Sequence, residues 1–328
     1  MSLVKDARVS DVKADYVVEL NGRDVTEFAT ASLSLEDAVN RIYSKLSLGF
    51  IQTEFHRLNV EVGMKIKLRY KTLTLFDGII FNASYADNYS ISITAYDYGI
   101  YYAKNYVSTR YKNTTAGTII KSVVKDAGLP LGDVADTRYI IPEYVADDKD
   151  VQAIIYELLD ITYAQTGVRF YPVLRDNKLH IAKSIKPKEA VVISETNNLI
   201  AVSREVSIDD LANYIVVRGG DKDKPTTSIA KDDASIAKYG RMMMVDSVDE
   251  KAKPSHARDR ANSLLKDNKK PTSSASLTAI GNFNILAGSH VYVEESRTGT
   301  VGEYVVTDVT HNVNMTSHTM SLKLEEAK

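Results

Sequence analysis

The chain is dominated by short segments in which apolar and polar residues alternate, the period of a strand with one buried face. One such segment surrounds Asn21-Gly22, a dipeptide typical of tight hairpin turns. A longer run, MKIKLRYKTLTLFDGIIFNASYADNYSISITAYDY, occupies residues 64–98 and contains the turn-forming pairs Asp77-Gly78 and Asp87-Asn88. These patterns predict a hairpin followed by an antiparallel meander.

Helical periodicity takes over after the meander. One helix is predicted between an N-cap at Thr115 and a terminating Gly128, and a second from about Asp150 to Gly167. A hairpin that turns at Asp176-Asn177 follows. Residues 111–190 are therefore expected to form a compact α+β domain.

The last third of the chain repeats this alternation of strand and helix. The segment SHARDRANSLLK at 255–266 has a narrow apolar stripe and predicts a helix capped by Ser255. Strand patterns resume at Leu277. The helix is therefore expected to lie in a domain inserted between strands.

Nine residues occur twice in nearly the same form, as SLEDAVNRI at 34–42 and SIDDLANYI at 207–215. Later features keep the same order, with VGMKIKLRY and then a glycine in the first copy and AGSHVYVEE and then a glycine in the second. The first copy contributes Ser34, Asp37, Asn40, Ile42, Gly63 and Gly78, and the second contributes Ser207, Asp210, Asn213, Ile215, Gly288 and Gly302.

The two copies differ in one spacing. Ser34 and Gly63 are 29 residues apart, whereas Ser207 and Gly288 are 81 apart, a difference of 52 residues that matches the inserted helical segment. The shared Asp and Asn residues are expected to satisfy turn amides or to cap a short helix.

These observations predict an α+β, mainly β fold with two related β-domains and two small α+β domains. The expected domains are a first β-domain at 1–110, an α+β domain at 111–190, a second β-domain at 191–222 and 277–328, and an inserted helical or α+β domain at 223–276.

Composition agrees with a folded, multi-domain protein of 328 residues, of which 44% are hydrophobic and 26% charged. An excess of Tyr (20) over Phe (7) favours half-buried strands. Lys and Arg total 41 against 43 for Asp and Glu, so no net positive field favours nucleic-acid binding. The absence of Cys excludes disulfides and thiolate chemistry.

Targeting signals are not expected either. The N-terminal segment MSLVKDARVSDVKADYVVEL is interrupted by charges and lacks the apolar core of a secretion signal. Apolar runs elsewhere fall short of the 18 residues typical of a membrane span. We therefore expect neither classical export nor a membrane anchor.

Catalytic and metal-binding patterns are weak. The six His residues lack metal-binding spacing, and His311 and His318 would have to meet across a hairpin to share a metal. Nucleotide loops and hydrolase elbows do not occur. We expect no catalytic residue, metal or cofactor.

Two alternatives remain open. Acidic pairs, Glu36-Asp37, Asp147-Asp148 and Asp209-Asp210, keep a peptidoglycan hydrolase possible in principle, because glycosidase carboxylates leave no local signature. A carbohydrate-binding module would suit Tyr-rich strands, but the Tyr residues are spread along the chain.

Several segments carry a family resemblance: TAGTIIKSVVKDAG, DDKDVQAIIYELLDITYAQTGVRFYP, EVSIDDLANYIVVRGG and GEYVVTDVTHNVNMTSHTMSLKL. Together they resemble the XkdQ-type tail proteins of PBSX-like prophages. These proteins are similar in plan to late control protein D and to the baseplate hub of T-even phages. The resemblance spans nearly the whole chain from about residue 15 and consists of spacing patterns, without a catalytic signature.

The resemblance implies a trimeric hub of a contractile tail or tail-like bacteriocin, with two tube-type β-domains per subunit. Three chains with two related domains each would form a ring with approximate sixfold symmetry that joins the sixfold tail tube to a threefold spike. It also implies contacts with other baseplate proteins, DNA only in transit through the lumen, and no enzymatic activity. Assembly would take place in the bacterial host cytoplasm, before incorporation into the particle.

Overall fold

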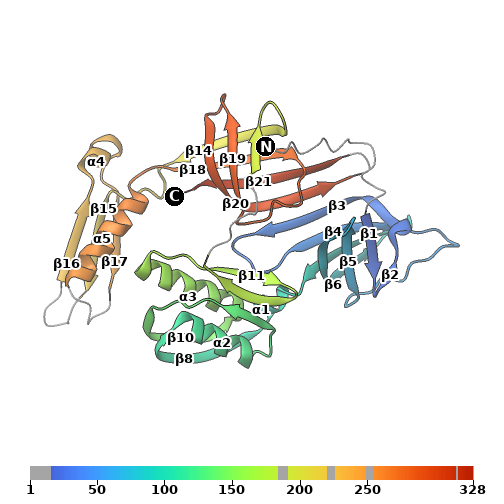
Figure 1. Ribbon diagram of the computed structural model, residues 1–328, viewed down its shortest axis with the longest axis horizontal. Coiled ribbons are helices and arrows are strands. Elements are labelled where there is room, and N and C mark those ends of the chain that lie inside the picture. The colour runs from blue at the N-terminus through green and yellow to red at the C-terminus, as the bar shows by residue number, and fades with distance from the viewer. Residues whose placement is uncertain (1–15, 184–190, 220–225, 249–253, 315–316, 328) are drawn as a thin grey trace. The chain divides into compact units, whose positions relative to one another are not determined.

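The computed structural model describes residues 16–183, 191–219, 226–248, 254–314 and 317–327, and it divides into two compact units (Figure 1). One unit comprises residues 1–202 and 276–328, and the other comprises residues 203–275. Strands make up 53% of the described residues and helices 19%, which confirms the predicted mainly β fold. The charged N-terminal segment before Tyr16 lies outside the described residues.

A 13-stranded sheet forms most of the first unit. Its N-terminal elements are β1 (Tyr16–Leu20), β2 (Arg23–Asp24), η2 (Thr26–Phe28), β3 (Ala29–Ala38), β4 (Lys45–Ile51), β5 (Lys65–Tyr70), β6 (Leu73–Tyr85) and β7 (Ser90–Asp97). Its C-terminal strands are β13 (Val191–Ser194), β14 (Leu199–Ser207), β18 (Thr272–Ile280), β19 (His290–Glu295), β20 (Thr300–Val313) and β21 (His318–Glu326).

The two halves of this sheet have the same strand order. The first half runs β3-β4-β7-β6-β5-β1, and the second runs β14-β18-β21-β20-β19-β13, so each strand has a counterpart in chain order. Both β6 and β20 shift register at the corresponding place, between Ile80 and Asn82 in β6 and between Val306 and Asp308 in β20. One difference is that β1 pairs antiparallel with β5, whereas β13 pairs parallel with β19.

Within the part of the chain that the structure describes, one antiparallel ladder joins the two halves. Strand β20 of the second half pairs with β3 of the first, from Asp308 opposite Ala38 to Val313 opposite Leu33. Figure 1 shows this contact as the red β20 running beside the blue β3. The long β20 thus pairs with β19 along its first residues and with β3 along its last.

Alternation along the strands builds the core of the sheet, as the sequence predicts. In β4 the residues Leu46, Leu48 and Phe50 are buried, while their neighbours are half-buried or exposed. Ile66 and Leu68 of β5 are fully buried in the same cluster. Burial of side chains of this size stabilises the fold by about 1.5–3 kcal/mol each.

The α+β domain follows the meander and belongs to the same unit. Its elements are α1 (Ile100–Lys104), β8 (Tyr106–Thr115), α2 (Ala116–Asp126), β9 (Leu131–Val134), β10 (Ile140–Asp150), α3 (Val151–Thr166), β11 (Tyr171–Arg175) and β12 (Lys178–Ala182). The predicted N-cap is confirmed, because Thr115 accepts the Thr118 amide at 3.3 Å. The second helix begins where expected, and Asp150 caps it by accepting the Ala153 amide at 2.8 Å. Gly167 ends α3 in the left-handed conformation, with φ of 68°.

The second unit contains a three-stranded sheet with two helices. Its elements are β15 (Tyr214–Gly219), β16 (Thr226–Lys231), α4 (Asp233–Tyr239), β17 (Met243–Ser247) and α5 (Pro254–Asn268). Ala257 and Ala261 of α5 pack in one cluster with Ile215 and Val217 of β15. These small residues on the predicted stripe let the helix approach the sheet closely.

Three local expectations differ from the structure. Strand β15, expected in the second β-domain, pairs with β16 and β17, so this unit begins earlier than residue 223. The alternating sequence of β15 predicts a strand but not the sheet that the strand joins. That sheet is decided by the strands that are available to pair with it in the folded chain. Helix α5 begins at Pro254, a favoured first helical residue, so Ser255 lies inside its first turn.

The third correction concerns Asp77-Gly78, which lies inside β6 instead of forming a turn. Chain reversal takes place at Lys71, where φ is 53°. A side chain at Gly78 would place its Cβ 2.2 Å from the backbone oxygen of Tyr96. The glycine therefore permits close approach of β7 to β6. In the sequence alone, a glycine with this role cannot be told from a glycine in a turn.

We predict different effects of alanine at two glycines of the first half. Gly78→Ala should lower stability by about 3 kcal/mol, because the new Cβ forces β7 away from β6. Gly63→Ala should lower it by about 1–2 kcal/mol, because its φ of 87° is strained for alanine but the surrounding space is open. Urea unfolding followed by circular dichroism tests this order, and equal shifts of the two midpoints would contradict it.

Candidate functional site

The repeated nonapeptides occupy matching places at the ends of corresponding strands. Ser34 lies in β3, between Asn312 of β20 and Ser47 of β4, and the chain turns after Ala38. Ser207 is the last residue of β14, and the chain leaves the strand there. Both copies therefore mark the point at which the chain leaves the sheet.

The shared isoleucines enter the cores of the domains next to these strand ends. Ile42 is buried in the α+β domain, where its amide donates to the Gln152 side chain at 2.9 Å. The Tyr156 hydroxyl donates to the Val39 carbonyl at 2.9 Å and fastens the same turn to α3. Ile215 is fully buried in the core of the second unit.

One member of each shared polar pair satisfies turn amides, as expected. Asp37 accepts the amides of Ala38 at 2.9 Å and Ala287 at 3.1 Å. The fully buried Asn213 accepts the Met242 amide at 2.9 Å, and its side-chain nitrogen donates to the Gly240 carbonyl at 2.8 Å. The other members, Asn40 and Asp210, are exposed.

Gly63 and Gly288 occupy the same position in the two halves. The Gly63 amide donates to the Ile80 carbonyl at 2.8 Å, and the Gly288 amide donates to the Val306 carbonyl at 2.8 Å. Their φ angles are 87° and 84°, in the region that favours glycine. This agreement sets Ile80 of β6 in correspondence with Val306 of β20.

Gly78 and Gly302 do not correspond in register. Gly78 lies two residues before Ile80, whereas Gly302 lies four residues before Val306. Gly302 has φ of 140° and lies opposite Val293, while Gly78 lies opposite Ile66. The two glycines therefore have separate local functions.

The two halves share an equivalent side-chain contact, although different residue types make it. The Tyr85 hydroxyl donates to the Val60 carbonyl in the first half. In the second half His311 Nε2 lies 3.0 Å from the Ile285 carbonyl. Val60 and Ile285 each stand three residues before the shared glycine, so the contact is equivalent. Sequence analysis missed it because Tyr and His differ, although both present a ring and a polar tip.

His311 and His318 meet across the β20–β21 hairpin, with Nδ1 and Nε2 3.2 Å apart. The ring of Phe283 stacks on His318 at a centroid distance of 3.9 Å. Burial lowers the pKa of His311, and burial together with the neighbouring His311 lowers the pKa of His318 to about 4. Among the described residues, His, Asp and Glu side chains do not gather in threes as a metal site requires.

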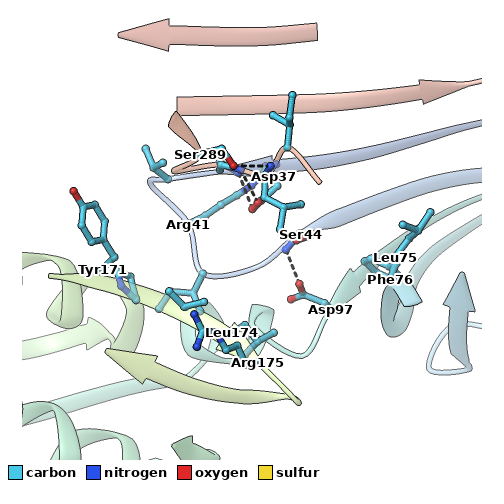
Figure 2. Close-up of a pocket in the computed structure, with 18 of the residues that line it drawn as sticks. Asp37, Arg41, Ser44, Leu75, Phe76, Asp97, Tyr171, Leu174, Arg175 and Ser289 are labelled. Atoms are coloured by element: carbon cyan, nitrogen blue, oxygen red, sulfur yellow. Dashed lines mark hydrogen bonds between the residues drawn. The ribbon is translucent and has the colours of Figure 1, made fainter. Parts of the chain in front are cut away.

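A cleft of about 740 Å³ lies in the first unit (Figure 2). Its lining comes from the end of β3 and the turn after it, residues 74–77 of β6, Asp97 of β7, the β11–β12 hairpin, Val191 of β13, and residues between 282 and 290. Asp37 and Asp97 lie along its wall in Figure 2. Asp97 accepts the amides of Ser44 and Gly99, each at 2.9 Å.

Burial governs the electrostatics of these two carboxyls. It raises the pKa of Asp37 to about 6, against the opposing effect of the Ala287 and Ala38 amides and of Arg41. It likewise raises the pKa of Asp97 to about 6, with a smaller contribution from the charge of Asp37. Both oxygens of each carboxyl accept backbone amides, so these groups brace turns, and Asp37 links the first half of the sheet to the second.

The fold is that of phage tail proteins. The 43 kDa tail protein of prophage MuSo2 from Shewanella oneidensis superposes with a TM-score of 0.72 at 12% identity, over 94% of this chain and 97% of that chain. The Escherichia coli c3393 protein, a type VI secretion component described as similar to the T4 tail proteins gp27 and gp5, gives 0.61 at 7% identity. That match covers 95% of this chain and 77% of that chain.

The chain belongs to the YQBQ-like family, whose model matches residues 33–325. It is 27% identical over 270 residues to the phage-like element PBSX protein XkdQ of Bacillus subtilis (strain 168), which covers 82% of this chain and 83% of that protein. The expected family resemblance is thus confirmed, and the protein is a phage tail or baseplate-like protein. None of the helices in the described parts of the chain is long and apolar enough to cross a membrane.

We predict that Asp37 makes stability depend on pH. Because its folded-state pKa lies above the 3.8 of an ordinary aspartate, its stabilising contribution is complete below about pH 4 and is lost as pH rises through about 6. The loss is up to about 3 kcal/mol. His318 acts in the opposite direction, because its lowered pKa makes stability fall as the pH falls.

Comparing Asp37→Asn with the parent chain isolates the aspartate. The amide does not titrate. As the pH rises from 4 to 7, the parent chain should therefore lose unfolding free energy relative to the Asp37→Asn variant. Urea unfolding across this range measures it. Asp259→Asn, on the exposed face of α5, is the control that should follow the parent profile. A pH-independent difference for Asp37→Asn would contradict the prediction.

Proposed function

We propose that the protein is a structural hub of a contractile tail, prophage or tail-like bacteriocin. Three chains form a ring of six related β-domains that joins the sixfold tail tube to a threefold spike. The observation that carries this proposal is the equal strand order of the two halves of the sheet, together with the shared bulge and glycine turn. A chain with two equivalent domains can match a sixfold surface with three subunits.

The duplication itself is part of the proposal. Twelve strands fall into two series of six, and the inserted unit accounts for the extra residues between β14 and β18. The four-domain division expected from sequence is proposed in this form, with the insertion beginning nearer residue 203 than 223. Relatives and structural neighbours from tail and secretion-spike proteins support the assignment of both tube-like domains.

The partners follow from this architecture. One face of the ring would contact the tail tube and the other the spike, while the α+β domain and the inserted unit are available to other baseplate proteins. DNA would pass through the lumen, and the balance of 41 basic and 43 acidic residues avoids a net positive lining that would hold phosphate. Assembly would take place in the bacterial host cytoplasm, before incorporation into the particle.

We further propose that the chain is not an enzyme. The repeated acidic residues that suggested a hydrolase are explained structurally where they are buried, because Asp37 accepts two backbone amides. Asp147 and Asp148 lie near the Ser108 hydroxyl on an exposed surface of the α+β domain. Two of the carboxyls that line the cleft, Asp37 and Asp97, each accept two backbone amides, so we assign them a structural role.

Ring formation predicts a trimer. Light scattering on the purified chain over rising concentration should approach three times the chain mass of 36.4 kDa. Electron microscopy of the same sample should show rings with threefold symmetry and six similar lobes. A monomer at all concentrations, or a dimer, would contradict the hub proposal.

The hydrolase alternative predicts a clear signal that the hub proposal excludes. In a zymogram containing bacterial cell walls, the purified chain should leave the gel uncleared. The doubly substituted Asp37→Asn, Asp97→Asn chain serves as the matched control for activity at the buried carboxyls. Clearing by the parent chain that is absent from this variant would overturn the non-enzymatic assignment.

A further inference from the structure

The ladder between β20 and β3 has an unused counterpart in the same chain. Strand β20 corresponds to β6 and strand β3 corresponds to β14 in the common strand order. The contact equivalent to β20–β3 is therefore β6–β14. Within the described residues, the chain does not make it: β14 ends the sheet, and only β7 pairs with Asn82–Tyr85 of β6.

The open edge of β6 resembles the part of β20 that pairs with β3. Beyond the shared bulge, Asn82 corresponds to Asp308 and Tyr85 to His311. His311 is 1% exposed, whereas Tyr85 is 60% exposed although both contact the equivalent carbonyl. The second half thus buries this position and the first half leaves it in solvent.

The edge of β14 shows the same contrast. By the nonapeptide alignment Leu33 corresponds to Val206, and Leu33 is 8% exposed while Val206 is 57% exposed. Strand β3 continues four residues beyond Ser34, to Ala38, along its ladder with β20. Strand β14 stops at the corresponding Ser207. Both differences are those expected of an edge strand whose partner is absent.

We propose that the far end of β6 and the two residues after it pair antiparallel with the end of β14 and the residues that follow it in a second copy of this chain. This inference rests on the proposed ring and specifies its subunit contact. Transfer of the β20–β3 register sets Tyr85 opposite Ile208, Ala86 opposite Ser207 and Asp87 opposite Val206 of the second copy. The contact is head-to-tail, because each chain offers β6 to one neighbour and β14 to the other.

A head-to-tail contact of this kind explains how both edges are protected. Exposed strand edges with apolar residues promote uncontrolled association, and closure into a ring removes them. With one ladder within each chain and one between neighbouring chains, three chains contain six equivalent junctions. The segment Asn82–Asp87 and the segment Val206–Leu211 are the two halves of each intermolecular junction.

Disulfide cross-linking tests the register, because the chain contains no Cys and each introduced thiol is unique. One chain carries Ala86→Cys and another carries Ser207→Cys. Oxidation of the mixture should give a covalent dimer, and a chain with both substitutions should give a covalent trimer. The matched control is Asn312→Cys with Ser34→Cys, the equivalent pair within one chain, which should give a bridged monomer.

An out-of-register pair provides the second control. Ala86→Cys with Ser203→Cys places the thiols four residues further apart, about 13 Å along the strand, beyond the roughly 7 Å limit of a disulfide. Preferential bridging at Ser207 supports the pairing. A trimer by light scattering in which Ala86 bridges no better to Ser207 than to Ser203 overturns the pairing but leaves the ring. A monomer with no bridging overturns both.

A charged substitution tests burial independently. Tyr85→Asp should weaken trimer association on the order of 100-fold or more, because an unpaired charge would be buried in the junction. Tyr106→Asp, on β8 at 63% exposure, should leave the trimer unchanged. Circular dichroism checks that both variants fold. A folded Tyr85→Asp chain that associates as tightly as the parent overturns the proposal.

Discussion

The ladder between β20 and β3 is the contact on which the rest of the large sheet depends. It joins strands whose nearest residues are separated by more than 250 positions in the chain and continues a single sheet from one half to the other. Asp37 reinforces it by accepting an amide from the turn that precedes β19. Because backbone bonds and the half-buried Asp37 carboxyl act at the same place, the two halves are held in a fixed register. The position of the cleft beside the turns follows from that register.

The other domains attach where the chain leaves this sheet. After β3 the turn inserts Ile42 into the α+β core and bonds to α3, and after β14 the chain enters the second unit, where Ile215 and Asn213 organise the first strand. The same nine-residue pattern therefore ends a strand and supplies one apolar anchor in both halves. This explains how the pattern stays recognisable although one copy is followed by a short turn and the other by a complete inserted unit.

Sequence reasoning found the elements whose signals are local. These are the cap at Thr115, the start of a helix near Asp150, the turn at Asp176-Asn177 and the glycines before β5 and β19. All of them act through neighbouring backbone groups. It misplaced Asp77-Gly78 and the partner of β15, because close strand approach and strand pairing depend on residues far away in the chain. It also missed the equivalence of Tyr85 and His311, which becomes visible only when the register and the carbonyl partners are known.

The position of β20 near the C-terminus has a consequence for synthesis. Ribosomes complete β3 some 260 residues before they reach β20, the strand with which it pairs. At about 5–20 residues per second, the edge of β3 stays open for roughly 13–50 s. Neighbouring nascent chains on one message present identical open edges during that interval. Translation speed and chaperone access would therefore influence how much of the product reaches the native fold.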